Sequence, residues 1–119
     1  MEEEKTLEEL IEDYNERKSM LGEDDYISIM IVSYICDAYN EMGEYDIAFE
    51  YTKKTYEFCL KNYGVNDFMT SHWLDKLVAC YKRVGDTDSI DLLFDEYYRI
   101  QRERLDIEIP DLTDDDILF

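Results

Sequence analysis

Few residues of this sequence have both the side-chain type and the spacing that a catalytic or metal-binding site requires. His72 is the single histidine and follows Ser71, but neither a nucleophile elbow nor a carboxylate placed to orient a base accompanies this pair. Cys36, Cys80 and His72 could be imagined as metal ligands, yet no CxxC or HxxxH spacing supports such a site. The sequence also lacks a glycine-rich loop for phosphate. We therefore expect no enzyme activity, no metal and no cofactor, and we expect these thiols to be packing residues.

Charge and composition narrow the class of partner. The 119 residues include 31 acidic and 12 basic side chains, which gives a formal net charge of −19. A surface this negative repels nucleic-acid phosphates and anionic lipid headgroups, so we expect no binding to nucleic acid or to a membrane. The three cysteines lie in apolar segments, which favours reduced thiols, and the N-terminus has no apolar signal region. The expected location is cytoplasmic.

The segments that would position any site repeat along the chain with a period of 42 residues. The pairs of identical residues with this separation include Gly22 and Gly64, Gly43 and Gly85, Tyr39 and Tyr81, Tyr14 and Tyr56, and Asp25 and Asp67. A fixed period of this length is typical of a stacked array of helical repeats rather than of an enzyme core.

Apolar periodicity predicts five helices, at about residues 6–20, 25–42, 45–62, 67–84 and 89–105. The first begins with a capping box formed by Thr6 and Glu9, and an aspartate or threonine of the turn at 85–88 is expected to cap the last. Segment 25–42 is apolar on almost every side, so we expect neighbours on more than one side of it. Tyr45 and Phe68 are assigned to the apolar sets of their helices. The short breaks predict antiparallel neighbours.

The C-terminal segment 106–119 departs from the helical period. Arg102 and Arg104 are expected to form the basic last turn of the fifth helix, where positive charge complements the helix dipole. Residues 106–110 alternate between polar and apolar and then reach a proline, which predicts an extended chain. Two alternatives are open for the remainder: a solvated, frayed terminus, or docking of Ile117–Leu118–Phe119 on a partner or on a groove of the protein itself.

Part of the chain resembles the tetratricopeptide repeat (TPR) family. The signature of that repeat places large, small and aromatic residues at set offsets, and these roles fall to Ile35, Cys36, Tyr39, Gly43, Tyr45 and Ala48. The period of 42 is similar to the longer repeat of kinesin light chains, whose Leu-Gly-acidic link resembles residues 21–25 here. The resemblance covers about residues 5–105. It implies that small side chains let paired helices approach closely and that the tyrosine wedges between them.

The resemblance also implies a function and a site. TPR arrays are scaffolds that bind peptides or protein segments without catalysis, and the first helix of each repeat lines their concave surface. Carried over to this sequence, the implied binding residues are Met30, Ser33, Tyr34, Asp37, Asn40, Glu41, His72, Asp75, Lys76, Ala79, Lys82 and Arg83. Such a groove could take an extended peptide, with Lys82 and Arg83 receiving a carboxylate.

Together these patterns predict an all-α fold, a TPR-like α-solenoid of about five antiparallel helices in residues 1–105, followed by an acidic tail in residues 106–119. The predicted function is a protein- or peptide-binding scaffold or adaptor. The alternative is an acidic regulatory or inhibitory protein that occupies the basic, nucleic-acid-binding site of a partner. Tyr97, Tyr98, Ile107 and Ile109 have no later helix to cover them, so self-association as a homodimer through the C-terminal end is also expected.

Overall fold

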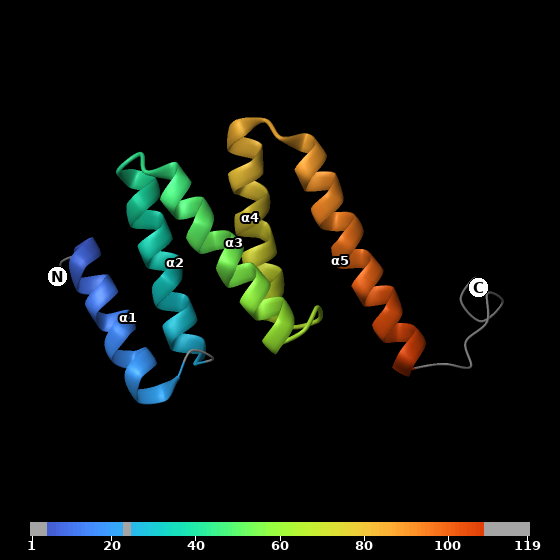
Figure 1. The fold of residues 1–119 in the computed structure, drawn as a ribbon, viewed down its shortest axis with the longest axis horizontal. Helices are drawn as coiled ribbons and strands as arrows, with labels where there is room; N and C mark the ends of the chain where they lie inside the picture. The colour runs from blue at the N-terminus through green and yellow to red at the C-terminus, as the bar shows by residue number, and fades with distance from the viewer. Residues whose placement is uncertain (1–4, 23–24, 109–119) are drawn as a thin grey trace.

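The computed structural model describes residues 5–22 and 25–108, the last five of them as backbone only, and places five helices in a row (Figure 1). The helices are α1 (Leu7–Leu21), α2 (Tyr26–Glu41), α3 (Tyr45–Asn62), α4 (Phe68–Val84) and α5 (Thr87–Glu108). They run alternately up and down, and each packs against the helix before and after it in the chain. All regular secondary structure in the described ranges is helical, which confirms the predicted all-α fold.

Side-chain caps fix where four of the helices begin. Thr6 and Glu9 form the predicted capping box at the start of α1. Asp25 accepts a hydrogen bond from the Ser28 amide at 3.0 Å, and Asp67, 42 residues later, accepts one from the Met69 amide at 2.8 Å. Asp86 accepts hydrogen bonds from the Ser89 amide and hydroxyl, so the cap of α5 comes from the predicted turn.

The ends of α2 and α4 repeat the same geometry 42 residues apart. Gly43 and Gly85 have φ of 78° and 74°, in the left-handed region that glycine adopts without a Cβ penalty. The Glu44 amide donates to the Tyr39 carbonyl at 2.9 Å, and the Asp86 amide donates to the Tyr81 carbonyl at 3.0 Å. This six-to-one hydrogen bond satisfies a carbonyl that the helix leaves open and turns the chain back toward the next helix. The backbone thus repeats with the period of the sequence.

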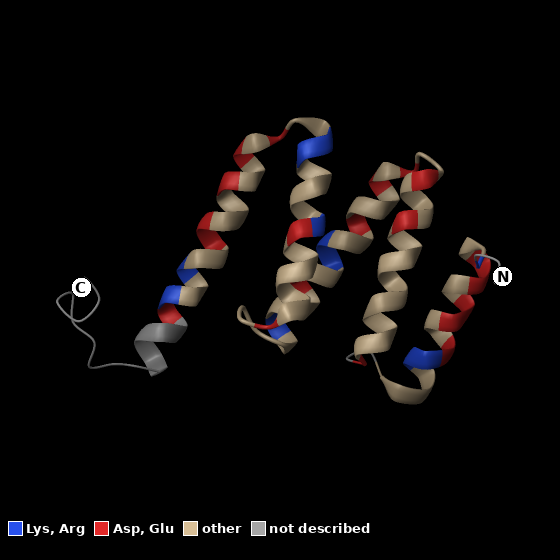
Figure 2. Cartoon of the chain, turned by 180° about the vertical axis from the view of Figure 1, so that it is seen from behind, with Lys and Arg blue, Asp and Glu red and all other residues tan. Residues whose placement is uncertain are grey.

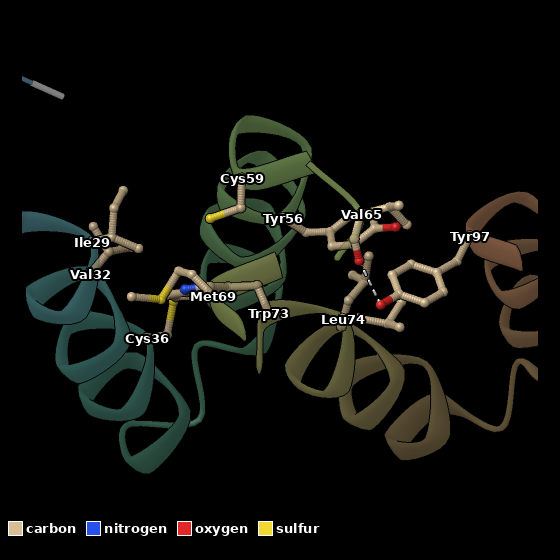
Figure 3. Close-up of a cluster of buried hydrophobic side chains, with 11 residues drawn as sticks. Ile29, Val32, Cys36, Tyr56, Cys59, Val65, Met69, Trp73, Leu74 and Tyr97 are labelled. Carbon is tan, nitrogen blue, oxygen red and sulfur yellow. Dashed lines mark hydrogen bonds between the residues drawn. The ribbon is translucent and has the colours of Figure 1, made fainter. Parts of the chain in front are cut away.

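The core lies between the helices and includes one cluster of buried side chains that contains Trp73 (Figure 3). Trp73 is fully buried in a cluster with Val32 and Cys36 of α2, Tyr56 of α3 and further residues of α4 and α5. The buried apolar members are Ile29, Val32, Cys36, Tyr56, Cys59, Val65, Met69, Trp73, Leu74, Leu77 and Tyr97.

Small residues mark the contact between α2 and α3. Cys36 and Ala48 are both buried, and the Thr52 hydroxyl donates to the Ala48 carbonyl at 2.7 Å. The Tyr39 ring stacks on the Tyr51 ring with centroids 5.7 Å apart. Cys36 is therefore a packing residue, as expected. Tyr45, by contrast, is 48% exposed, so its assignment to the apolar set of α3 was wrong.

The predicted end of the last helix was also wrong. α5 continues to Glu108, so residues 106–108 are helical rather than extended, and Arg102 and Arg104 are not in its last turn. Polar–apolar alternation over three residues is too weak a signal to end a helix that has already formed. Each further residue adds a backbone hydrogen bond at little cost, so the helix continues. The proposed docking of 117–119 falls in residues 109–119, outside the described part of the chain.

The C-terminal end of the row of helices, at α5, exposes fewer apolar side chains than expected. Tyr97 is only 8% exposed, and its hydroxyl donates to the Val65 carbonyl at 2.9 Å, so the expectation that it lies uncovered was wrong. α5 turns Leu93, Phe94 and Tyr97 inward onto the core cluster. Tyr98 remains half exposed, stacked on Phe94. The side chains of Ile107 and Ile109 lie outside the described residues.

The Asp86 cap predicts a specific pH dependence of stability. Hydrogen bonds from the Ser89 hydroxyl and amide lower the pKa of the Asp86 carboxyl. A lowered pKa contributes stability that is present above the unfolded-state value and is lost as the pH falls through the folded-state value. We expect Asp86→Asn, which can still cap but does not titrate, to lose less stability than the wild type between about pH 6 and about pH 2.

The measurement is urea unfolding at both pH values. Asp88→Asn removes one charge from the same turn and serves as the matched control, since the chain has many acidic groups that titrate in this range. An equal pH dependence in Asp86→Asn and Asp88→Asn would contradict a role for the cap.

Candidate binding surface

Three side-chain pairs connect α2 with α4. The Tyr26 hydroxyl donates to Asp67 at 2.6 Å, the Lys76 ammonium lies 3.5 Å from an Asp37 oxygen, and Arg83 donates to the Asn40 side-chain carbonyl at 3.1 Å. The paired residues are 41, 39 and 43 positions apart, so each pair joins nearly equivalent positions of consecutive repeats. Equivalent faces of α2 and α4 therefore lie beside one another and form one surface.

We call this the α2/α4 surface and define it by the residues that α2 and α4 present there. They are Tyr26, Met30, Ser33, Asp37 and Asn40 of α2, and Phe68, His72, Asp75, Lys76, Ala79, Lys82 and Arg83 of α4. Ten of the twelve predicted binding residues are in this set. Ser33, Asn40 and Lys76 are partly buried, and the other seven are exposed. Their role in binding stays a prediction.

The remaining two predicted residues lie on a different side of α2. Tyr34 and Glu41 border a hollow of about 360 Å³ between α1 and α2, together with Asp37, Ala38, Lys5 and Leu10. Tyr34 is 55% exposed. The predicted site is thus divided between two adjoining surfaces, with Asp37 on the boundary.

Two basic residues of the α2/α4 surface, Arg83 and Lys76, are already engaged by neighbours. Arg83 has its guanidinium carbon 4.5 Å from the centre of the Tyr45 ring as well as its bond to Asn40. Lys76 lies 5.6 Å from the centre of the Trp73 ring while it pairs with Asp37. A guanidinium has five N–H donors, so Arg83 keeps donors for a ligand while its position is fixed. Lys82 is exposed.

The exposed apolar side chains of this surface include one that was not among the predicted binding residues. Phe68 is 76% exposed, so its assignment to the apolar set of its helix was wrong. Met30, on α2, is 49% exposed. Phe68 and Trp73 are five positions apart, which turns Phe68 about 140° away from the buried side of α4. A helical wheel of α4 would have revealed this.

The uncharged ring of His72 lies next to the rings of Phe68 and Trp73. The Phe68 ring stacks on it with centroids 6.2 Å apart, and the Trp73 ring meets it edge-on. Partial burial, followed by the nearby Lys76 ammonium, lowers the pKa of His72, so the imidazole is uncharged at neutral pH. It offers one donor and one acceptor within an otherwise aromatic patch.

Two other features, a cluster of metal ligands and a membrane-spanning helix, are absent from the part of the chain that the structure describes. In residues 5–22 and 25–108 no three His, Cys, Asp or Glu side chains come together as a metal site. The described helices include none long and apolar enough to cross a membrane. Comparisons of the chain with protein-family models, with curated proteins and with solved structures each found no match.

Proposed function

We propose that this protein is a non-catalytic scaffold that binds a protein segment or peptide on the α2/α4 surface of a short, TPR-like α-solenoid. Two features support the architecture. Each helix packs on its chain neighbours, and the caps at Asp25 and Asp67 and the turns at Gly43 and Gly85 recur at the sequence period. Neighbour packing of repeated helical units is what defines a solenoid.

The observation that carries the binding proposal is the exposure of Phe68 and Met30 beside polar groups whose positions are fixed. An exposed aromatic ring contributes large contact area at low entropic cost, and such rings are frequent anchors of protein interfaces. The Asp37–Lys76 pair and then the Asn40–Arg83 pair hold donors and acceptors in place farther along the same two helices. A ligand therefore meets an arranged surface rather than mobile side chains, which lowers the entropic cost of binding.

The same arrangement favours an extended segment as the ligand. His72, Asn40 and Arg83 present side-chain donors and acceptors that suit backbone amides and carbonyls or a carboxylate. Phe68 and Met30 offer contact for one or two apolar side chains of that segment. Phe68 and Arg83 lie at opposite ends of α4, about 22 Å apart along the helix. An extended peptide with an apolar anchor and an acidic residue about seven positions away would satisfy both parts of the surface.

The test is selection of binding peptides from a random displayed library on the immobilised chain, followed by calorimetric titration of the selected peptides. We expect Phe68→Ala to weaken them about tenfold or more, which corresponds to loss of an anchor of about 1.4 kcal/mol. We expect Arg83→Ala to weaken those that carry a carboxylate. Leu92→Ala on α5 is the matched control, because Leu92 is similarly exposed, at 69%, but outside the surface.

The result also separates this proposal from the charge-based alternative. Figure 2 shows acidic residues along both outer helices, α1 and α5, and a basic partner could recognise that charge alone. Binders that tolerate Phe68→Ala and Arg83→Ala but weaken steeply with salt would favour the alternative and contradict the scaffold proposal.

A further inference from the structure

One face of α2 lacks the helix that covers the equivalent face of α4. Met69, Lys76 and Arg83 of α4 correspond, 42 residues earlier, to Ile27, Tyr34 and Glu41 of α2. On α4 this face meets α2: Met69 is buried in the cluster with Val32 and Cys36, Lys76 pairs with Asp37, and Arg83 bonds to Asn40 (Figure 3).

On α2 the corresponding residues face outward. Ile27 is 52% and Tyr34 is 55% exposed, whereas Met69, the counterpart of Ile27, is only 4% exposed. Ala38, the counterpart of Cys80, lines the hollow between α1 and α2. Residues 27, 34, 38 and 41 are spaced so that they share one face of a helix. We call the set Leu10, Ile27, Tyr34, Ala38 and Glu41 the α1/α2 face.

The charges at one end of this face indicate which charge a helix that covers it would carry there. The last turn of α2 has no basic residue, whereas that of α4 has Lys82 and Arg83. Glu41 therefore lies at the negative end of the α2 dipole with no basic residue of its own helix beside it. Asp37 lines the same hollow, and Lys5, its one basic lining residue, pairs with Asp13. A cation placed against Glu41 would complement its carboxylate and the helix end.

We propose that the α1/α2 face binds an amphipathic helix of another protein, one with an aliphatic stripe and a lysine or arginine in its last turn. This helix would extend the row by one member, as α2 does for α4. The face from Ile27 to Glu41 is about 21 Å long, which matches a helix of about 14 residues. Its stripe covers Ile27, Tyr34 and Ala38, and its cation lies against Glu41.

A helix of different charge is favoured over a second copy of this chain. Two copies would each bring a formal charge of −19, and their mutual repulsion opposes a contact at a face that is itself acidic. The proposal goes beyond the function proposed for the α2/α4 surface, because Ile27 and Ala38 are outside that surface and either surface could bind without the other.

The test uses a synthetic helical peptide of about 16 residues with a leucine stripe and lysines in its last turn, titrated into the full chain by fluorescence anisotropy. A scrambled peptide of the same composition controls for charge alone. We expect the striped peptide to bind at least about tenfold more tightly than the scrambled one, and amide chemical-shift changes to gather on α1 and α2. We expect the chain variant Ile27→Lys/Ala38→Lys to lose about tenfold or more in affinity, since it blocks the stripe and repels the lysines.

Two matched variants make the outcome specific. Leu92→Lys/Tyr98→Lys adds the same two charges at exposed positions of α5 and should bind like the wild type. Phe68→Ala, which damages the α2/α4 surface, should also leave the affinity unchanged, so failure of the proposed function and failure of this inference are distinguishable. Circular dichroism confirms that each variant is folded.

Three results would overturn the proposal. Equal affinity for the striped and scrambled peptides would mean that charge alone is recognised. A dimer in sedimentation that is lost in Ile27→Lys/Ala38→Lys would make a second copy the occupant. Shift changes on α1 and α2 when Ile117, Leu118 and Phe119 are replaced by serine, without added peptide, would make the chain's own segment the occupant.

Discussion

Replacing Trp73 with alanine is expected to cost about 3–5 kcal/mol of folding free energy, the largest effect of any single truncation in this protein. Trp73 is fully buried among residues of α2, α3 and α4, so its removal opens a cavity that borders three helices (Figure 3). Domains of this size are stable by only about 5–15 kcal/mol in total. The variant should therefore be close to unfolding at room temperature.

The indole nitrogen of Trp73 allows a sharper form of this test. It is buried, and no hydrogen-bond partner is found for it among the described residues. Trp73→Ala therefore removes packing contacts but no hydrogen bond. Trp73→Phe keeps an aromatic ring in the core and removes the unsatisfied donor. We expect Trp73→Phe to destabilise the protein clearly less than Trp73→Ala.

The measurement is urea unfolding followed by far-UV circular dichroism, because the protein has a single tryptophan and its fluorescence is lost in both variants. Phe68→Ala is the control: Phe68 is 76% exposed, and its truncation should change stability by no more than about 0.5 kcal/mol. A cost for Trp73→Ala as small as that of the control would show that the cluster around Trp73 is not the centre of the core.

Local signals in the sequence were sufficient for the helices and their caps. Aspartates at 25 and 67 and glycines at 43 and 85 act through neighbouring residues, and the hydrogen bonds and positive φ found there follow from residue type alone. The predicted segment 45–62 coincides with α3, and α1, α2 and α4 begin and end within one residue of their predicted bounds. Helix boundaries set by short-range chemistry are therefore readable without a structure.

Features that depend on neighbouring helices were less predictable. Tyr97 is buried because α5 turns it toward the α3–α4 turn, a contact between residues 32 positions apart. Tyr34 and Glu41 share a helix with Asp37 and Asn40, yet only the position of α4 reveals that they lie outside the contact between α2 and α4. Periodicity says which residues share a face, and packing decides which neighbour that face meets.

The three cysteines should report how this row of helices opens. Burial raises the pKa of Cys59 to about 12 and that of Cys36 to about 11, from an ordinary value of 9.0. At about pH 8 their reactive thiolate is then about a hundred to a thousand times scarcer than in an exposed thiol, and the closed fold bars the reagent as well. Cys80 is only partly buried. We expect an alkylating reagent to modify Cys80 first, by at least about a hundredfold in rate, as followed by mass spectrometry.

Comparison of the two slow thiols shows whether the helices unfold together. Cys36 lies at the contact between α2 and α3, where its sulfur is 3.6 Å from the Thr52 hydroxyl oxygen. Cys59 lies at the contact between α3 and α4, where the Thr70 hydroxyl donates to its carbonyl at 3.1 Å. If the row opens as one unit, both react at the rate set by global unfolding, and Trp73→Ala accelerates both by the same factor, about a hundredfold or more. If each contact between neighbouring helices opens separately, the two thiols react at different rates. Modification of Cys59 as fast as Cys80 in the wild type would contradict both cases, because it would require an α3–α4 contact that is open in the native state.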